Sequence, residues 1–426
     1  MKILMVIPYA PNLISVRPYN LIRFLSAKGH DVTLATVYRN AEELADIEGL
    51  RSVCANVIAV RQSKSRSLLN ALCVLPRKLP LQSVYSWSPT LSARLSELLV
   101  GEGRQAPFDV VHVEHLRGAE YGLFISAECA RQAIQPAPAV VWDSVDCISL
   151  LFEQAARNSR SLFGRWVTRF ELGRTRDYEG FLSQQFDRIL MTTSADREAF
   201  LRLAPNSSNA TPVSILSNGV DLDYFSPGSN TRREQATLLV SGKMSYHANI
   251  TMVLFLVEEV MPRIWTGRPD VRLNIVGKDP PASIRSLARD ERISVTGMVP
   301  DVRSFLRRAT VAVAPIQYGV GIQNKVLEAM ACETPVVASP QAASALSATS
   351  GRELFVAEDI DSFTEAILAL LADRKLQRKM GLAGRAYVEK HHDWSAIALR
   401  LENLYRETIA VRPSKMEPEE VKEPGF

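Results

Sequence analysis

The sequence has few cysteines and lacks a long apolar run. Only 5 of its 426 residues are cysteines, and they are widely spaced, with no paired pattern typical of a metal site. Their odd number and scatter favour a reduced, cytoplasmic protein without structural disulfides. No window reaches the ~18 uninterrupted apolar residues of a spanning helix. No cleavage-site pattern of a signal peptide follows the apolar start, so we expect neither a transmembrane segment nor a leader.

Charge of one sign is also missing. Lys and Arg number 50 against 46 acidic residues, a net charge of +4, which is no signature of nucleic-acid binding. The distribution is uneven, since residues 51–100 hold seven Lys or Arg and one acid, Glu97. The hydrophobic share of 46% can build a large core, which excludes a disordered chain.

Apolar runs alternate with amphipathic segments along the chain. Residues 3–8 form a continuous apolar run, typical of a strand covered on both faces. A helical pattern and a second strand follow within ~40 residues, which predicts a parallel βαβ unit. The pattern stops at a polar stretch with Pro and Gly and then begins again. We therefore predict an α/β fold with two doubly wound, Rossmann-like domains.

The predicted boundaries follow from this alternation. The first domain covers residues 1–215, a linker covers 216–235, and the second domain covers 236–393. Residues 394–411 form a strongly amphipathic helix. Residues 412–426 are polar and rich in proline, so we expect them to be disordered.

The most informative stretch is 314–339. A loop with two glycines leads into a helix that begins near Asn324. A helix N-terminus carries free N–H groups and a partial positive charge, which suits a phosphate, and Lys325 adds a full charge. Glu328 shares that face and can accept hydrogen bonds from vicinal sugar hydroxyls. Spacing alone leaves an ordinary Lys–Glu pair after a glycine turn as the alternative.

This stretch resembles the donor-site motif of the family-four glycosyltransferases, which have the two-domain GT-B fold. Segments similar to the family follow in the right order over about residues 216–340: "LSNGVDLDYFSP", "VSGKMSYHANITMVL", "LNIVGKDPP", "VTGMVPDVRSFL" and "GIQNKVLEAMA". The last segment is shared with sugar transferases of bacterial exopolysaccharide gene clusters, which we take as the nearest branch. The first half resembles the family more loosely, through "DVVHVEH" and "VVWDSVDCISLLFE".

The resemblance implies a retaining hexosyltransferase in polysaccharide or glycoconjugate biosynthesis. It would move a sugar from a nucleotide-diphosphate donor, a UDP- or GDP-sugar, to a glycan or lipid-linked acceptor. It implies two domains that face each other across a cleft, with the donor on the second domain and helix 394–411 crossing back onto the first. No cofactor and no metal are required, and nucleic acid is not a partner.

The resemblance also assigns the donor-binding residues. They are Gly242, Lys243, Met298, Val299, Gly321, Ile322, Gln323, Asn324, Lys325 and Glu328. Lys243 and Lys325, with the helix N-terminus, are expected to stabilise charge on the leaving diphosphate. A surface lysine at a turn is the alternative for Lys243, and Asn249 is expected to cap the next helix.

The sequence departs from the family at two places. Most members carry two glutamates separated by seven residues, of which Glu328 is the second, and Val320 stands where the first would be. The first glutamate holds the transferred sugar in the family, so Gln323 and Asn324 are the candidates for that contact here. Arg17 lies in the first strand-to-helix loop, where many relatives have glycines, and we expect it to bind a phosphate or an anionic acceptor.

His115 and Asp143 are the predicted catalytic residues of the first domain. Each lies at the end of a predicted strand, and the carboxyl ends of strands line the ligand crevice of open α/β sheets. We expect His115 to hydrogen-bond the donor sugar or the acceptor, and Asp143 to contact either one, with a helix N-cap as the alternative for Asp143. A metal site at His112 and His115 is disfavoured, because strand alternation points them to opposite faces.

Two segments are candidates for contact with an anionic membrane surface. Residues 61–78 mix basic residues with leucines, and residues 160–176 combine Phe163, Trp166 and Phe170 at helical spacing with five arginines. Basic amphipathic helices are typical of proteins that lie on a bilayer. A core-facing stripe with a solvated arginine face is the alternative. A membrane contact would make the protein peripheral at the inner face of the plasma membrane.

Three other functions fit parts of the pattern. A GT-B sugar-nucleotide epimerase would use the same fold without an acceptor. A non-catalytic nucleotide-sugar-binding protein would explain Val320 and the missing glycines. A dinucleotide oxidoreductase fits worst, because no Gly-x-Gly-x-x-Gly follows the first strand.

Overall fold

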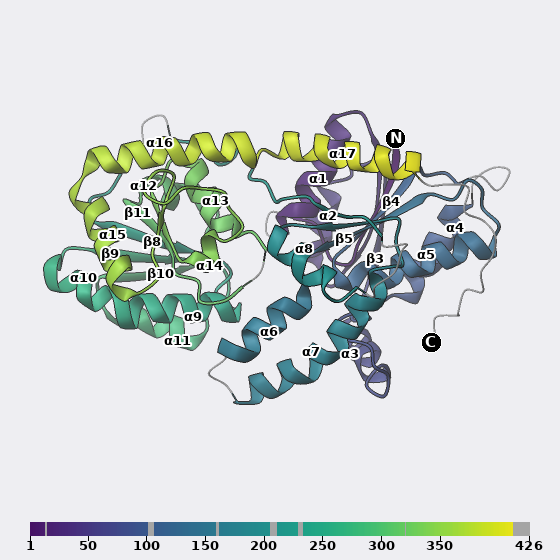
Figure 1. The fold of residues 1–426 in the computed structure, drawn as a ribbon, viewed down its shortest axis with the longest axis horizontal. Coiled ribbons are helices and arrows are strands. Elements are labelled where there is room, and N and C mark those ends of the chain that lie inside the picture. The colour runs from purple at the N-terminus through teal and green to yellow at the C-terminus, as the bar shows by residue number, and fades with distance from the viewer. Residues whose placement is uncertain are drawn as a thin grey trace. The chain divides into compact units, whose positions relative to one another are not determined.

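A computed structural model describes residues 1–12, 15–100, 106–158, 162–204, 211–228, 233–319 and 321–411, without the side chains of 157–158 and 162–167. The chain divides into two units, residues 1–217 with 395–426, and residues 218–394 (Figure 1). Val320, the predicted tail 412–426, and the aromatic side chains predicted at 163 and 166 lie outside this description. Among the residues described, no helix is both long and apolar enough to cross a membrane.

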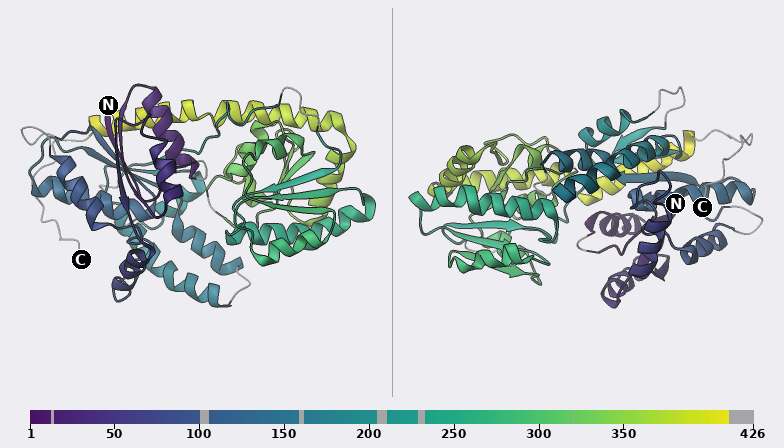
Figure 2. Two further views of the ribbon diagram at one scale, coloured as in Figure 1. Left: turned by 180° about the vertical axis from the view of Figure 1, so that it is seen from behind. Right: turned by 90° about the horizontal axis from the view of Figure 1, so that it is seen from below.

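The first unit contains a seven-stranded parallel sheet in the order β3-β2-β1-β4-β5-β6-β7. The five residues from Ile3 to Ile7 are completely buried, as expected for a strand with helices on both faces (Figure 2). The strands are β1 (Lys2–Ile7), β2 (Asp31–Tyr38), β3 (Asn56–Arg61), β4 (Val110–Glu114), β5 (Ala139–Val145), β6 (Arg188–Met191) and β7 (Val213–Ile215).

Helices connect these strands on both faces of the sheet. They are α1 (Val16–Ala27), α2 (Ala41–Glu48), α3 (Lys64–Cys73), α4 (Pro89–Leu99), α5 (Ala119–Arg131), α6 (Ile148–Asn158), α7 (Leu162–Leu182) and α8 (Ser194–Leu201). Local sequence explains several of the starts. Ser88 accepts a hydrogen bond from the Leu91 amide and precedes Pro89 at the first position of α4, a pairing that suits a helix N-terminus.

The C-terminal helix α17 (Trp394–Val411) packs on the first unit, where it is yellow in Figure 1. Its buried Tyr405 hydroxyl lies 2.8 Å from His112 Nδ1 on β4. The Arg188 guanidinium, on β6, donates to Thr408 Oγ1 at 2.6 Å. The predicted return of this helix to the first domain is therefore confirmed.

The second unit repeats the architecture with six parallel strands in the order β10-β9-β8-β11-β12-β13. The strands are β8 (Thr237–Ser241), β9 (Arg272–Val276), β10 (Ile293–Gly297), β11 (Val311–Ala314), β12 (Val336–Ala338) and β13 (Phe355–Val356). The helices are α9 (His247–Phe255), continued by the π-helical turn Leu256–Val260 and α10 (Met261–Gly267), then α11 (Ala282–Arg285), the 3₁₀ turn Ser286–Arg289, α12 (Arg303–Arg308), α13 (Asn324–Ala331), α14 (Pro340–Ala343), α15 (Ile360–Ala372) and α16 (Arg374–His391).

Both sheets have the doubly wound order, in which the connections reverse direction beside the first strand. The predicted α/β fold class, with two doubly wound, Rossmann-like domains, is confirmed.

The contact between α17 and the first unit yields a stability prediction. Tyr405→Phe removes the hydroxyl that pairs with the buried His112 ring, so it should lower the free energy of unfolding by about 1–3 kcal/mol. Urea denaturation measures this. Tyr19→Phe is the control, because its hydroxyl makes no hydrogen bond to another described residue. Equal losses in the two variants would contradict the proposed contribution of the hydroxyl.

Candidate functional site

The reversal of strand order marks one position in each sheet. In the second unit it lies between β8 and β11, whose carboxyl ends lead into the loops at 242–246 and 315–323. Ligands of open α/β sheets bind at such a point, because the two loops leave in opposite directions and open a crevice. Most of the predicted donor residues of this unit follow these two strands.

Two glycines bring the loops after β8 and β9 into direct contact. Gly242 has φ 145° and Gly277 has φ 155°. A Cβ atom on Gly277 would lie 1.7 Å from the Gly242 carbonyl oxygen, so no other residue fits there. The predicted ligand residue Gly242 therefore lies where its backbone is packed closely and a side chain is excluded.

Asn249 connects the two loops of the crevice. Lys325 Nζ donates to Asn249 Oδ1 at 2.7 Å, and Asn249 Nδ2 donates to the Lys243 carbonyl at 2.9 Å. The expectation that Asn249 caps its helix is wrong, because Tyr246 is the N-cap and Asn249 lies inside the first turn of α9. Nothing in the local sequence indicates this role, because Asn249 lies in a segment with two other polar residues, His247 and Thr251, and its partner Lys325 is 76 residues away.

Lys325 and Glu328 lie on the first turns of α13 with strongly perturbed pKa values. Burial lowers the pKa of Lys325 to about 8, against the opposing charge of Glu328. Burial raises the pKa of Glu328 to about 7, against the opposing charge of Lys325. Neither a hydrogen bond nor an ion pair joins the two within the described residues. Shifts of this kind, with a named charge partner, are characteristic of functional sites.

No side chain caps the N-terminus of α13 within the described residues, where Gln323 is the N-cap residue. Asn324 Oδ1 is buried and finds no hydrogen-bond partner in the described part of the chain. A buried polar atom without a partner is costly unless a ligand or water satisfies it. The observed polarity suits an anion or a sugar hydroxyl.

The other residues predicted to bind the donor lie in two parts of the second unit. Gly321 (φ 69°) and the buried Ile322 complete the loop before α13. The Lys243 side chain is exposed beside Gly242. Met298 is 64% exposed after β10, while Val299 packs against the core. β10 is separated from β8 by β9, so Met298 and Val299 stand apart from the Lys325 group.

Tyr318 is a second residue of this crevice without a local signal in the sequence. Its hydroxyl lies 2.8 Å from His247 Nδ1, and the two rings stack at 5.4 Å. This contact joins the loop after β11 to the start of α9 and so supports the same crevice as Asn249.

The first unit has its strand reversal between β1 and β4. Nearby, Arg17 donates to both carboxylate oxygens of Asp143, at 2.8 and 3.1 Å. The two residues are 4% and 0% exposed. Arg17 lies in the first turn of α1 and not in the preceding loop as expected. Its guanidinium pairs with Asp143, and its direct contact with an anionic ligand stays a prediction. The structure places Asp143 as the support of Arg17, and its direct contact with a sugar stays a prediction.

His115 follows β4 in a left-handed conformation, φ 63°. Its Nδ1 accepts a hydrogen bond from the Arg117 amide at 3.3 Å. Burial and the nearby Arg117 charge lower the pKa of His115 to about 3. The ring is therefore neutral near pH 7, and with Nδ1 as an acceptor its proton is on Nε2. His115 can donate a hydrogen bond to a substrate but is a poor general acid.

The partly buried Tyr9 and the buried Glu114 form another pair at this edge. The Tyr9 hydroxyl donates to Glu114 Oε1 at 2.9 Å. Burial raises the pKa of Glu114 to about 8. Tyr9 had no local signal in the sequence, because only the fold brings it beside β4. His112 faces Tyr405 instead, and the described residues contain no group of three or more side chains suited to a metal ion.

Comparisons with known proteins agree with this arrangement. Residues 235–373 match the family model described as "Glycosyl transferases group 1". The chain is 31% identical over 160 residues to the GDP-mannose-dependent monoacylated alpha-(1-6)-phosphatidylinositol monomannoside mannosyltransferase of Corynebacterium glutamicum, covering 34% of this chain and 42% of that protein. It is 31% identical over 211 residues to the phosphatidyl-myo-inositol mannosyltransferase of Mycobacterium leprae, covering 47% and 55%. The chain thus spans about half the length of these curated relatives.

Solved structures agree on the fold. The sucrose-phosphate synthase of Thermosynechococcus elongatus matches with a TM-score of 0.63 and 18% identity, over 97% of this chain and 100% of that chain. WaaG, a glycosyltransferase involved in lipopolysaccharide biosynthesis, matches with a TM-score of 0.61 and 15% identity, over 95% and 99%. At these identities the likeness shows the fold alone.

The shifted pKa values of the second unit predict a pH profile for ligand binding. Affinity for a nucleoside diphosphate should fall above about pH 8, as Lys325 loses its proton, and below about pH 7, as Glu328 gains one. Calorimetric titration across pH 5–9 measures both limbs.

Glu328→Gln is the matched variant for this profile. The substitution should abolish the loss of affinity below about pH 7 that is assigned to Glu328. It should also shift the loss of affinity at high pH to a lower pH, because the Glu328 charge raises the pKa of Lys325. Protonation of the nucleoside diphosphate itself affects the wild-type protein and the variant equally, so it does not alter the comparison. An acidic limb that is identical in the two would rule out the assignment to Glu328.

Proposed function

We propose that the protein is a retaining glycosyltransferase that uses a UDP- or GDP-sugar and a glycan or lipid-linked acceptor. The observation that carries the proposal is the placement of Lys325, which Asn249 holds at the strand reversal beside the open N-terminus of α13. This placement lies inside the segment that matches the glycosyl transferase family model. The likeness of the whole fold to glycosyltransferase structures supports it.

In this proposal the second unit stabilises the leaving group. Lys325, the exposed Lys243 and the first amides of α13 stabilise the negative charge that grows on the diphosphate. Glu328, one turn further on, accepts hydrogen bonds from the ribose hydroxyls. The buried Asn324 Oδ1, which has no partner among the described residues, is free to contact the transferred sugar.

The transfer needs no separate base. The bond between the sugar carbon and the phosphate oxygen breaks, a bond to the acceptor oxygen forms on the same face, and the acceptor proton passes to the leaving phosphate. His115 donates from Nε2 to a sugar or acceptor hydroxyl, since its Nδ1 is occupied. Asp143 acts through Arg17, whose position it fixes. The protein's contribution is thus positioning and electrostatic stabilisation.

The similar proteins favour particular substrates. Two of them are named as phosphatidylinositol mannosyltransferases, one dependent on GDP-mannose. These names support a GDP-sugar donor and a lipid-linked acceptor. The placement in an exopolysaccharide branch rests on the "GIQNKVLEAMA" segment alone. Epimerase activity is the second candidate, and incubation with donor alone separates the two, because only an epimerase would convert it.

Lys325→Ala tests the phosphate role. Loss of a charge-assisted hydrogen bond should weaken nucleoside diphosphate binding by about tenfold or more and leave binding of the bare nucleoside nearly unchanged. Lys375→Ala, an exposed lysine on α16, is the matched control. Equal weakening of nucleoside and nucleoside diphosphate binding would show that Lys325 does not bind the phosphates.

We further propose that α3 lies on an anionic membrane, which places the protein at the inner face of the plasma membrane. This helix is held to the protein by polar groups. Gln62 donates to the buried Ser67 hydroxyl at 3.1 Å, and Asn70 donates to the carbonyls of Val84 and Trp87 at 3.0 and 2.8 Å. Its leucines face solvent instead, with exposures of 59%, 54% and 51% for Leu68, Leu69 and Leu72, and Leu75, just beyond its end, is 39% exposed.

Positively charged side chains surround these exposed leucines, and this combination favours an anionic bilayer as the binding partner. Lys64 and Arg66 lie on α3, and Arg77 and Lys78 follow it. Arg174 on α7 donates to the carbonyls of residues 75 and 79 and so ties α7 to the same face. Leucines inserted among basic side chains suit the interface of an anionic leaflet.

Leu68→Ser with Leu69→Ser and Leu72→Ser should lower binding to phosphatidylglycerol vesicles by about tenfold or more, since each buried leucine contributes about 1.5–3 kcal/mol. Vesicle sedimentation measures this. The control combines Leu382→Ser and Leu399→Ser, which are 48% and 47% exposed on other helices. Unchanged sedimentation of the α3 variant, or equal loss in the control, would exclude α3 as the contact.

A further inference from the structure

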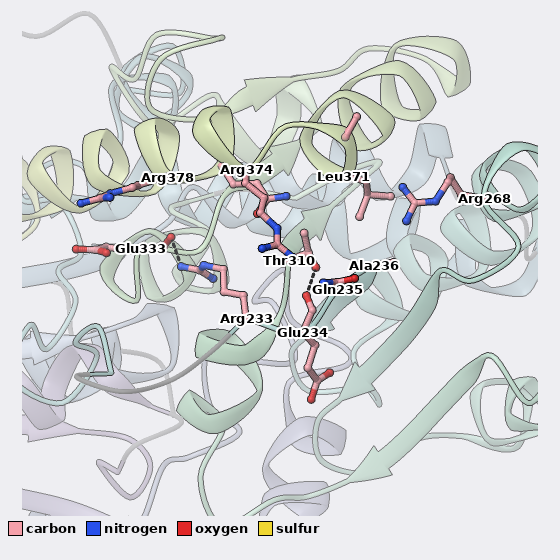
Figure 3. A pocket seen from close by; sticks show the side chains of 12 residues that line it. Arg233, Glu234, Gln235, Ala236, Arg268, Thr310, Glu333, Leu371, Arg374 and Arg378 are labelled. Carbon is pink, nitrogen blue, oxygen red and sulfur yellow. Dashed lines mark hydrogen bonds between the residues drawn. The ribbon is translucent and has the colours of Figure 1, made fainter.

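A polar cavity lies in the second unit at the end of its sheet opposite the donor loops. It has a volume of about 560 Å³, and Figure 3 shows the side chains that line it. Ala236 and Thr310 immediately precede β8 and β11, so the cavity is at the amino ends of the strands whose carboxyl ends carry the donor loops. Its volume falls within the about 300–1,000 Å³ typical of small-molecule sites.

The lining is rich in arginine. It contains four arginines and two glutamates: Arg233, Arg268, Arg374, Arg378, Glu234 and Glu333. Glu234 is 3.5 Å from Arg308, which is not part of the lining, so one of the two negative charges is already compensated. An excess of positive charge in a cavity of this size favours an anionic ligand.

The four arginines have different partners. Arg233 is held in place by backbone carbonyls, those of Ala309 at 2.9 Å and of Glu333. Arg268 forms a bidentate pair with Asp270 at 2.8 Å. Arg374 and Arg378 make neither a hydrogen bond nor an ion pair to any residue that the structure describes, and both are exposed on α16.

Arg374 and Arg378 lie one helical turn apart on α16 and both line the cavity, with side chains that extend in different directions (Figure 3). Two guanidinium groups at this spacing present planar forks of donors, the geometry that suits phosphate oxygens. Arg233 comes from the loop before β8 and adds a third positive charge. Donors that converge from separate elements on one cavity have the character of a binding site.

We propose that this cavity binds a small, soluble, phosphate-bearing molecule through Arg374 and Arg378. The site is separate from the donor crevice, and the proposal does not depend on the proposed function. The fixed charge of Arg233 attracts the anion. Arg374 and Arg378, which have no hydrogen-bond partner among the described residues, donate to its phosphate oxygens.

Calorimetric titration with inorganic pyrophosphate tests the site. All proteins carry Lys325→Ala, so that the predicted donor site contributes little. Adding Arg374→Ala and Arg378→Ala should weaken binding by about tenfold or more, because two charge-assisted contacts are lost. Binding to the protein with intact arginines should also weaken as salt is raised.

The matched control adds Lys375→Ala and Lys379→Ala instead. These residues lie on the same helix with the same spacing, are exposed and do not line the cavity. They remove the same charge and should leave binding unchanged. Equal weakening in both double variants, or no pyrophosphate binding with the arginines intact, overturns the proposal.

A lipid headgroup is the other source of the same chemistry, and vesicle sedimentation distinguishes it. The arginine variant should bind phosphatidylglycerol vesicles as well as the lysine variant does. Loss of vesicle binding confined to the arginine variant, with pyrophosphate binding retained, would assign the site to a membrane and overturn a soluble ligand.

Discussion

The candidate sites of this protein depend on one constraint of parallel β-sheets. A right-handed crossover carries the chain to one side, so a sheet that grows in both directions from its first strand must reverse its connections once. In the two units the reversal falls at β1/β4 and at β8/β11. The loops that leave these strand pairs diverge, and polar side chains can therefore gather between them without filling the gap. Tyr9, Glu114 and His115 lie at or just after the ends of one pair, while Gly242, Asn249 and Lys325 follow the other.

Buried charged side chains are paired differently in the two units. In the first, Arg17 and Asp143 satisfy each other, and removal of either would leave an uncompensated buried charge at a cost of about 3–5 kcal/mol. In the second, the Lys325 ammonium has three donors and one hydrogen-bond partner in the described chain, Asn249. Its pKa of about 8 shows that desolvation is not fully offset by Glu328. The first pair is therefore a structural support, whereas Lys325 keeps capacity for a ligand.

The sequence predicts those features that depend on neighbours along the chain. Apolar runs and helical spacing give the strands and the doubly wound order, and the 314–339 stretch locates Lys325 and Glu328 on the first turns of one helix. Contacts between distant residues leave no such local signal. Asn249 resembles a helix cap in its own segment, but its partner Lys325 is 76 residues away. His112 and Tyr405 are 293 positions apart. The pairing of Arg17 with Asp143 likewise appears only once the sheet has formed.

The exposed leucines of α3 are not explained by the stability of the fold. A short helix normally turns its apolar face toward the core, because each buried leucine contributes about 1.5–3 kcal/mol. Here Ser67 and Asn70 face inward and are satisfied by hydrogen bonds, which contribute only about 0.5–1.5 kcal/mol each. The opposite orientation would place these polar groups in water at little cost and bury the leucines. The observed orientation of α3 is therefore the less stable one for the protein alone, and it becomes favourable only when an apolar partner covers the leucines. The surrounding lysines and arginines favour a partner whose surface is negatively charged.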